Sequence, residues 1–147
     1  MKVARSRVIR AHVGDVWRVL ADPYALPRWW PRVRRVEGAG EEGWTMLLGK
    51  PGGRGVRADQ RLEQSEPERL RRWSLVVPGS PFERVLSASV TEARLAPAVE
   101  GTELRLELRQ SPRGWARFGG FMLRRAAQRQ LDEALDGMAR ALEGPAA

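Results

Sequence analysis

The sequence contains no cysteine and a single histidine, His12. The lack of cysteine excludes a disulfide scaffold, a thiolate nucleophile and any zinc site built on thiolates. One histidine is too few for a His-rich metal cluster or for a two-histidine motif at helical spacing. His12 falls in a surface link after the first predicted strand, and we assign it no catalytic role. The sequence therefore predicts neither a bound metal nor a cofactor.

Long apolar runs are also missing from the chain. No window approaches the roughly 18 apolar residues that a membrane-spanning helix requires. The N-terminal segment carries Arg5, Arg7 and Arg10 and lacks the apolar stretch of a secretory signal peptide. We therefore expect a cytoplasmic protein without stable membrane insertion. Its 147 residues predict one domain, residues 1–147, because domains usually have about 100–150 residues.

Acidic residues are fewer than basic ones, which leaves a net charge of +8 and an isoelectric point near 11.3. Of the 26 basic residues, only Lys2 and Lys50 are lysines. A basic surface can attract nucleic acid, anionic membranes or acidic ligands. Here the arginines are scattered among Asp and Glu along most of the chain, and no nucleic-acid motif accompanies them. We therefore expect a solvated arginine-rich surface and no nucleic-acid partner.

Two short helices are predicted to follow a first strand at residues 2–10. Apolar residues at positions i, i+3, i+4 and i+7 predict an amphipathic helix over residues 13–20. Residues 24–30 form a second short helical piece, which Pro27 limits to a turn or two. The apolar face of the first helix comprises Val13, Val16, Trp17 and Leu20.

Between residues 32 and 110, short segments with period-two alternation are separated by Gly, Pro and acidic turns. With the first strand they predict about seven strands, and the short links between them favour antiparallel pairing. The expected strands are 32–37, 44–48, 56–63, 73–77, 83–95 and 103–109. The inward side of 83–95 stays open, because both alternating sets hold apolar residues and a bulge would exchange them. One set is Thr91, Ala93 and Leu95, and the other is Leu86, Ala88 and Val90.

A long amphipathic helix is predicted over residues 115–143, with an irregular start at Gly119 and Gly120. Its apolar stripe comprises Trp115, Phe118, Met122, Leu131, Ala134, Leu135, Met138 and Leu142. The fold class is thus α+β, with a curved antiparallel sheet whose apolar face is covered by this helix. A strongly curved sheet wrapped around a helix often leaves a cavity between the two.

Several segments in this order resemble the SRPBCC (START-like) superfamily, in particular its polyketide cyclase/dehydrase and lipid-transport branch. They are residues 8–11, 14–17, 20–23, 26–33 and 101–104, together with the terminal helix. The resemblance covers nearly the whole chain and implies the helix-grip fold, with a deep hydrophobic cavity between sheet and long helix. It does not imply one activity, because the superfamily includes lipid carriers, receptors, cyclases, dehydratases and chaperone activators.

Aromatic residues are the first candidates for contact with a ligand in such a cavity. Trp29 and Trp30 are adjacent, so we expect one to pack in the core and Trp30 to lie at the cavity rim. Trp44 and Trp73 lie on strands in which apolar residues alternate with other residues, and each would either fill the core or line a pocket. Leu75 shares the face of Trp73. Gln60 is the polar side chain that strand alternation best directs inward.

The remaining candidates are aliphatic or lie at the start of the long helix. Leu104 and Leu106 belong to an uninterrupted aliphatic face that suits either core or pocket wall. Phe118, Phe121 and Met122 fall where the resemblance suggests an entrance to the cavity, although core packing is the simpler role for Phe118 and Met122.

No set of side chains forms a recognisable catalytic site. We therefore expect the protein to bind or transport a hydrophobic small molecule such as a lipid, polyketide or isoprenoid. The first alternative is a polyketide cyclase or dehydratase acting in the same cavity, which would need an inward acid or base. The second is a protein-interaction or client-binding module that uses the basic surface. Whether the protein is an enzyme stays open at this point.

Overall fold

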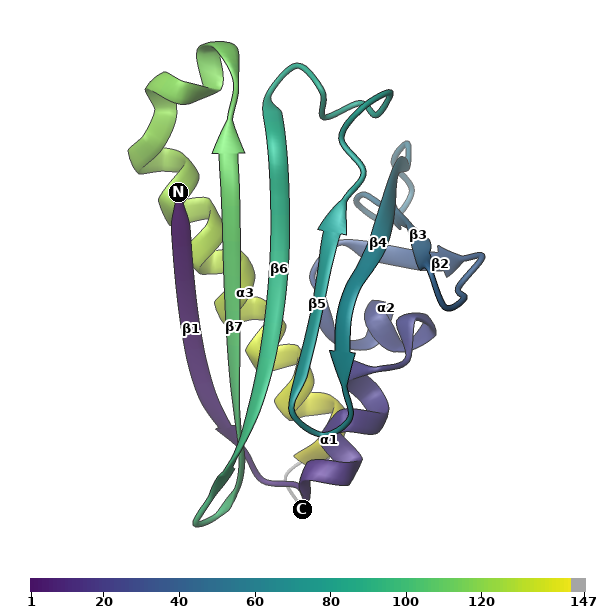
Figure 1. Cartoon of the computed structure of the whole chain (residues 1–147), viewed down its shortest axis with the longest axis vertical. Coiled ribbons are helices and arrows are strands. Elements are labelled where there is room, and N and C mark those ends of the chain that lie inside the picture. The colour runs from purple at the N-terminus through teal and green to yellow at the C-terminus, as the bar shows by residue number, and fades with distance from the viewer. Residues whose placement is uncertain (144–147) are drawn as a thin grey trace.

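A computed structural model describes residues 1–143, without the side chains of residues 115 and 116. Figure 1 shows a curved sheet with a long helix lying diagonally across it. The helical elements are α1 (Val13–Leu20), η1 (Pro23–Ala25), α2 (Leu26–Trp29), η2 (Gly114–Gly119) and α3 (Gly120–Glu143). The strands are β1 (Lys2–Ile9), β2 (Val33–Glu37), β3 (Gly43–Leu48), β4 (Val56–Glu66), β5 (Leu70–Leu75), β6 (Leu86–Ala98) and β7 (Gly101–Pro112).

All seven strands form one antiparallel sheet in the order β1-β7-β6-β5-β4-β3-β2. After β1 the chain passes through α1, η1 and α2 to the opposite edge, and it then returns strand by strand until β7 pairs with β1. The short α1–α2 region closes one end of the sheet, and α3 covers its concave face (Figure 1). The α+β helix-grip architecture expected from the sequence is confirmed.

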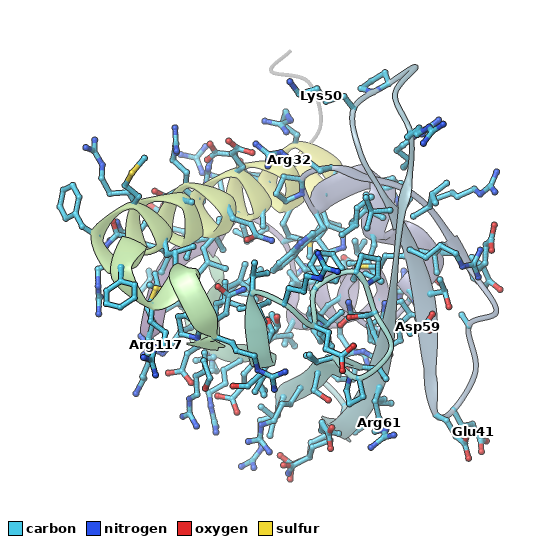
Figure 2. All side chains as sticks on the ribbon, turned by 90° about the horizontal axis from the view of Figure 1, so that it is seen from above. Arg32, Glu41, Lys50, Asp59, Arg61 and Arg117 are labelled. Carbon is cyan, nitrogen blue, oxygen red and sulfur yellow. The ribbon has the colours of Figure 1, made fainter. Side chains whose placement is uncertain are left out.

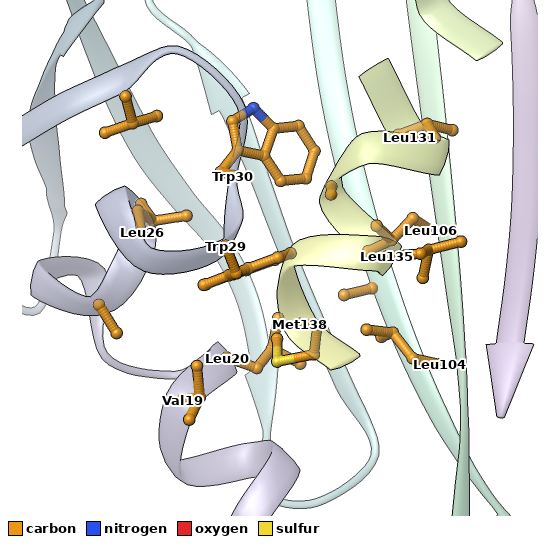
Figure 3. Packing of buried hydrophobic residues seen from close by; sticks show 14 of the residues in the cluster. Val19, Leu20, Leu26, Trp29, Trp30, Leu104, Leu106, Leu131, Leu135 and Met138 are labelled. Carbon is orange, nitrogen blue, oxygen red and sulfur yellow. The ribbon is translucent and has the colours of Figure 1, made fainter. Parts of the chain in front are cut away.

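The core occupies the half of the concave face near α1 and α2. Figure 3 shows α1, α2, β7 and α3 meeting there through apolar side chains. Leu104 and Leu106 of β7 and Leu131 and Met138 of α3 are completely buried. Each such side chain contributes about 1.5–3 kcal/mol through removal of its surface from water. This cluster holds α3 against the sheet.

The inward side of β6, which the sequence left open, is the one that carries Thr91, Ala93 and Leu95. The pairing of β6 with β7 shifts register between Leu86 and Ala88. Because a bulge moves the alternation by one residue, Leu86 also reaches the concave side.

The apolar stripe of the C-terminal helix is buried only in its later turns, from Ala127 to Ala139. Core packing of Phe118 and Met122 is therefore wrong, since both side chains are largely exposed. The reason lies in the length of the sheet: Figure 1 shows η2 and the first turns of α3 beyond the start of β1. The irregular start is confirmed by the 3-10 segment η2. The side chain of Trp115 lies outside the described part of the structure.

One glycine allows α3 to approach α2 closely. A Cβ atom at Gly137 would lie 2.3 Å from the carbonyl oxygen and 2.8 Å from the Cα of Trp29. Both are backbone atoms, which cannot rotate away as a side chain can. The helix interior normally disfavours glycine by about 1 kcal/mol relative to alanine, so its presence here reflects the contact with α2.

We predict that Gly137→Ala lowers the free energy of unfolding by about 2 kcal/mol despite the better helix propensity of alanine, because α2 must move away from α3. Urea denaturation followed by circular dichroism measures this. Gly120→Ala is the matched control: a Cβ there meets nothing within 4 Å. Equal stability of the two variants would contradict the close contact.

The convex face carries two glutamates in neighbouring strands, each surrounded by basic side chains. Glu92 of β6 and Glu107 of β7 are directly paired in the register. Glu92 accepts from Arg72 Nη2 at 2.6 Å and from Arg94 Nε at 2.9 Å. Glu107 accepts from Arg109 Nε at 2.9 Å and also pairs with Lys2 and Arg105. The cations screen two like charges that would otherwise repel each other.

Burial raises the pKa of Glu92, but the hydrogen bonds and charges of Arg72 and Arg94 outweigh it, and the net pKa lies below its ordinary value of 4.5. A carboxyl group whose pKa is lower in the folded protein than in the unfolded chain stabilises the fold at pH values above its ordinary pKa. This stabilisation is lost as the pH falls through the lowered pKa.

We therefore predict that Glu92→Gln destabilises the protein by about 1 kcal/mol at pH 7, and that the difference from wild type shrinks below pH 4.5. Thermal denaturation across this pH range measures it. Glu103→Gln, an exposed residue of β7 with the same change in charge, serves as the control. A difference that persists at low pH would argue against the charge network.

Candidate functional site

The other half of the concave face encloses a cavity of about 500 Å³ between the sheet and α3. Its position follows from the register of the inward residues along β7. Leu104 and Leu106 contact the core, while the next two inward residues, Leu108 and Gln110, line the cavity. On the helix side, Ala126, Arg129, Gln130 and Glu133 of α3 complete the lining of the cavity.

Apolar side chains form most of the cavity wall. Trp30 follows α2, and Trp73 and Leu75 project from β5. The remaining apolar members are Met46, Leu48, Val56, Ala58, Phe82, Leu86, Leu108 and Ala126. The volume of the cavity falls within the range of small-molecule pockets, and its lining combines these apolar side chains with several polar and charged ones.

Two tryptophans of the wall belong to a chain of ring contacts. The Trp30 ring meets the Trp73 ring edge to face, with centroids 6.0 Å apart, and also contacts Trp29 at 5.4 Å. Trp29 points into the core. The backbone of Trp30 is already extended at the end of α2, and this allows the Trp30 side chain to reach the cavity. These contacts hold the two cavity-lining rings in fixed orientations.

Trp44 lies behind this wall. Its ring centroid is 5.8 Å from that of Trp73, and the Arg71 guanidinium lies 5.5 Å from the centroid of the Trp44 ring. Burial lowers the pKa of Arg71, whose Nη1 donates to Ser65 Oγ at 3.1 Å. Trp44 therefore supports the cavity wall through Trp73.

A few polar side chains also face the cavity from the sheet. They are Gln60 of β4, Ser89 and Thr91 of β6, and Gln110 of β7. Gln110 Nε2 donates to Ser89 Oγ at 3.3 Å. Within the described chain, neither the Gln60 amide nor the Thr91 hydroxyl has a side-chain hydrogen-bond partner, so both can bond to a ligand or to water.

The sequence identified Gln60 by its alternation with Val56 and Ala58. Gln110 was missed, although it lies two residues after Leu108 and so continues the same inward face. Thr91 belonged to one of the two sets of β6 residues between which the sequence could not choose, because both sets hold apolar residues. Ser89 shares the side of Thr91 and was missed.

Charged side chains gather at the mouth of the cavity. Arg129 and Glu133 project from α3, and Arg32 comes from the link between α2 and β2. In Figure 2, Arg32 lies on the same side of the molecule as α3, whereas Arg61 lies on the opposite side. Over residues 1–143, neither Arg32 nor Arg129 forms an ion pair with a carboxylate.

Arg32 also has a left-handed backbone, with φ of 66°. This region is unfavourable for a residue with a Cβ atom, and such strain is common at functional sites. The conformation follows Pro31 and reverses the chain as it enters β2. It places the Arg32 side chain at the cavity mouth.

The residues expected to bind a ligand fall into three groups. Trp30, Gln60, Trp73 and Leu75 line the cavity. Trp44, Leu104 and Leu106 are buried in the core beside it. Phe118, Phe121 and Met122 are exposed around the start of α3 and do not line it. Contact of any of them with a ligand stays a prediction.

The described chain offers little for metal or nucleophilic chemistry. Residues 1–143 contain no group of three or more His, Cys, Asp or Glu side chains placed to hold a metal ion. His12 is exposed at the start of α1, away from the cavity. The one carboxylate among the cavity-lining residues is Glu133. Of the helices in this part of the chain, none combines the length and apolar content needed for a membrane crossing.

Comparison with protein families gives a match over residues 1–143 to the model described as polyketide cyclase / dehydrase and lipid transport. The SRPBCC resemblance noted in the sequence is thereby confirmed. A search of curated proteins finds no match.

Solved structures with the same fold include a START superfamily protein from Mycobacterium smegmatis, with a TM-score of 0.78, 12% identity and 97% coverage of both chains. The di-domain ARO/CYC protein StfQ of the steffimycin biosynthetic pathway has a TM-score of 0.77 and 15% identity, with 97% of this chain matching 50% of that one. A protein from Deinococcus radiodurans has a TM-score of 0.68 and 21% identity, with 95% coverage of both chains. At these identities the likeness concerns the fold alone.

Proposed function

The chain belongs to the polyketide cyclase/dehydrase and lipid-transport family, and from this premise we propose that its cavity binds one hydrophobic small molecule, such as a lipid, a polyketide or an isoprenoid. The observation that carries the proposal is the 500 Å³ space walled by Trp30, Trp73 and aliphatic side chains. Removal of apolar ligand surface from water drives binding, at about 25 cal/mol for each Å² buried.

The polar side chains of the cavity indicate which polar groups the ligand has in addition to its apolar part. Gln60 of β4 and Thr91 of β6 face the cavity from strands on either side of β5, and each offers a donor and an acceptor. A ligand with a hydroxyl or carbonyl group satisfies them, whereas a pure hydrocarbon leaves them unpaired. We therefore favour an amphipathic ligand.

The charges at the mouth favour an anionic end. Arg32 and Arg129 contribute two positive charges against the single carboxylate of Glu133. Neither arginine is committed to an ion pair within the described chain. A carboxylate at the ligand's outer end would meet both guanidinium groups while its chain lies in the cavity.

A cyclase or dehydratase reaction in this cavity is the second candidate. It requires an acid or base near the reacting atoms. Glu133 is the single observation in its favour, but this carboxylate is exposed at the mouth rather than enclosed by the wall. Binding without turnover therefore remains the leading proposal.

We predict that Gln60→Trp abolishes binding of a fluorescent fatty acid, because the larger side chain occupies the cavity beside Trp73. Arg61→Trp is the matched control, since it adds the same side chain to the opposite face of the same strand (Figure 2). Fluorescence titration gives the dissociation constants, and circular dichroism establishes that both variants fold. Undiminished binding by a folded Gln60→Trp variant would rule out the cavity as the site.

We further predict that Arg129→Gln weakens dodecanoate binding about threefold to fivefold and leaves dodecanol binding nearly unchanged, because only the carboxylate gains from the guanidinium charge. Isothermal titration calorimetry measures both ligands. Arg140→Gln, on the same helix but away from the cavity, is the control. Equal losses for acid and alcohol would show that Arg129 does not recognise an anionic end.

A further inference from the structure

Three large apolar side chains are exposed together around the start of α3. Phe118, Phe121 and Met122 have exposed fractions of 78%, 73% and 75%. Water disfavours such contiguous apolar surface, and on soluble proteins it marks contact with a partner or a membrane. Figure 1 shows the segment that carries them, η2 and the first turn of α3, beyond the start of β1 and beside the ends of β6 and β7.

The three side chains precede the part of α3 that lines the cavity. Phe118 lies in η2, and Phe121 and Met122 follow three and four residues later in the first turn of α3. Four residues after Met122 comes Ala126, and seven residues after it comes Arg129, both of which line the cavity. The exposed surface therefore begins where the cavity mouth ends.

Basic residues without acidic neighbours in the sequence surround this apolar surface. Between Glu107 and Asp132 the chain contains no Asp or Glu but six arginines. The Arg117 guanidinium lies 6.0 Å from the centroid of the Phe118 ring, and that of Arg125 lies 5.7 Å from the Phe121 ring. Within the described chain, Arg117, Arg124 and Arg125 form no ion pair. Residues 108–131 are the longest stretch of the sequence without an acidic residue.

We propose that this docking surface, formed by Phe118, Phe121, Met122, Arg117, Arg124 and Arg125, binds reversibly to an anionic lipid bilayer. Aromatic and methionine side chains enter the boundary between head groups and acyl chains, and the arginines meet the lipid phosphates. The surface combines exposed apolar side chains with arginines that have no carboxylate partner in the described chain, a combination that an anionic bilayer binds. Docking brings the cavity mouth against the lipid.

The docking itself depends only on the exposed surface. Its consequence, that a hydrophobic ligand enters the cavity directly from the membrane, rests on the proposed function. A contact made by three apolar side chains and a few arginines gives weak, salt-sensitive association with the bilayer rather than insertion into it.

The test is co-sedimentation of the full-length protein with vesicles of phosphatidylcholine alone or of an equal mixture with phosphatidylglycerol. We expect binding to the mixed vesicles at least about tenfold tighter than to phosphatidylcholine, with weakening as salt is added. The double variant Phe121→Ser/Met122→Ser is expected to reduce binding to mixed vesicles by about tenfold. Because both side chains are exposed, the variant should fold, and circular dichroism checks this.

Two controls distinguish binding through this surface from the effect of net charge or of any exposed apolar side chain. Val99→Ser removes another fully exposed apolar side chain, in the turn between β6 and β7, and should bind like the wild type. Arg124→Gln/Arg125→Gln should weaken binding more than Arg54→Gln/Arg61→Gln, although the net charge is the same. Equal effects of the two arginine pairs, or wild-type binding by the Phe121/Met122 variant, would overturn the proposal.

The remaining outcomes identify other partners or separate the two proposals. Binding to polyglutamate or polyuridylate but not to vesicles, lost in the Phe121/Met122 variant, would replace the bilayer by an acidic macromolecule. The Gln60→Trp variant should still bind vesicles, because its change lies inside the cavity. If this variant loses fatty-acid binding but still binds vesicles, the result bears only on the proposal that the cavity binds a ligand. If the wild-type protein fails to bind vesicles, only the proposal of a membrane docking surface is contradicted.

Discussion

The structure depends on the contact between the later turns of α3 and one half of the concave sheet. Leu131, Leu135 and Met138 meet Leu104 and Leu106 there, and α2 closes the cluster through Trp29. The absence of a side chain at Gly137 lets the two helices approach at backbone distance. Because this contact occupies only part of the helix, α3 is held firmly at one end, while its other end extends over and beyond the sheet.

The cavity is the consequence of that partial contact. Where α3 no longer touches the sheet, a space remains between the inward residues of β3 to β7 and the side chains of α3 that face them. Ring contacts among Trp30, Trp73 and Trp44 keep this wall from collapsing into the space, because large aromatic side chains in mutual contact have few alternative packings. Polar groups are then tolerated at Gln60 and Thr91, since a ligand or water can satisfy them there.

The arginine-rich surface serves different purposes in different places. On the convex face the arginines neutralise Glu92 and Glu107, whose direct pairing would otherwise be unfavourable. At the cavity mouth and around the start of α3 they have no carboxylate partners within the described chain. The same residue type thus stabilises the sheet in one region and leaves positive charge available for ligands or lipids in another. Net charge alone cannot distinguish these roles, because it ignores which charges are neighbours.

Local patterns in the sequence were sufficient for the elements, their order, the α+β class and the inward position of Gln60, because alternation and helical periodicity depend only on neighbouring residues. Tertiary structure alone decided three other properties. Pairing in the sheet put Thr91 and Ser89 of β6 on the cavity side, and a bulge nearer the start of that strand added Leu86. The first turn of α3 and η2 lie beyond the start of β1 (Figure 1), which left Phe118 and Met122 exposed on an otherwise well-predicted stripe. The third is that Arg32 and Arg129 border the same cavity, since residues nearly a hundred positions apart in the sequence come to one site only through the packing of α3 on the sheet.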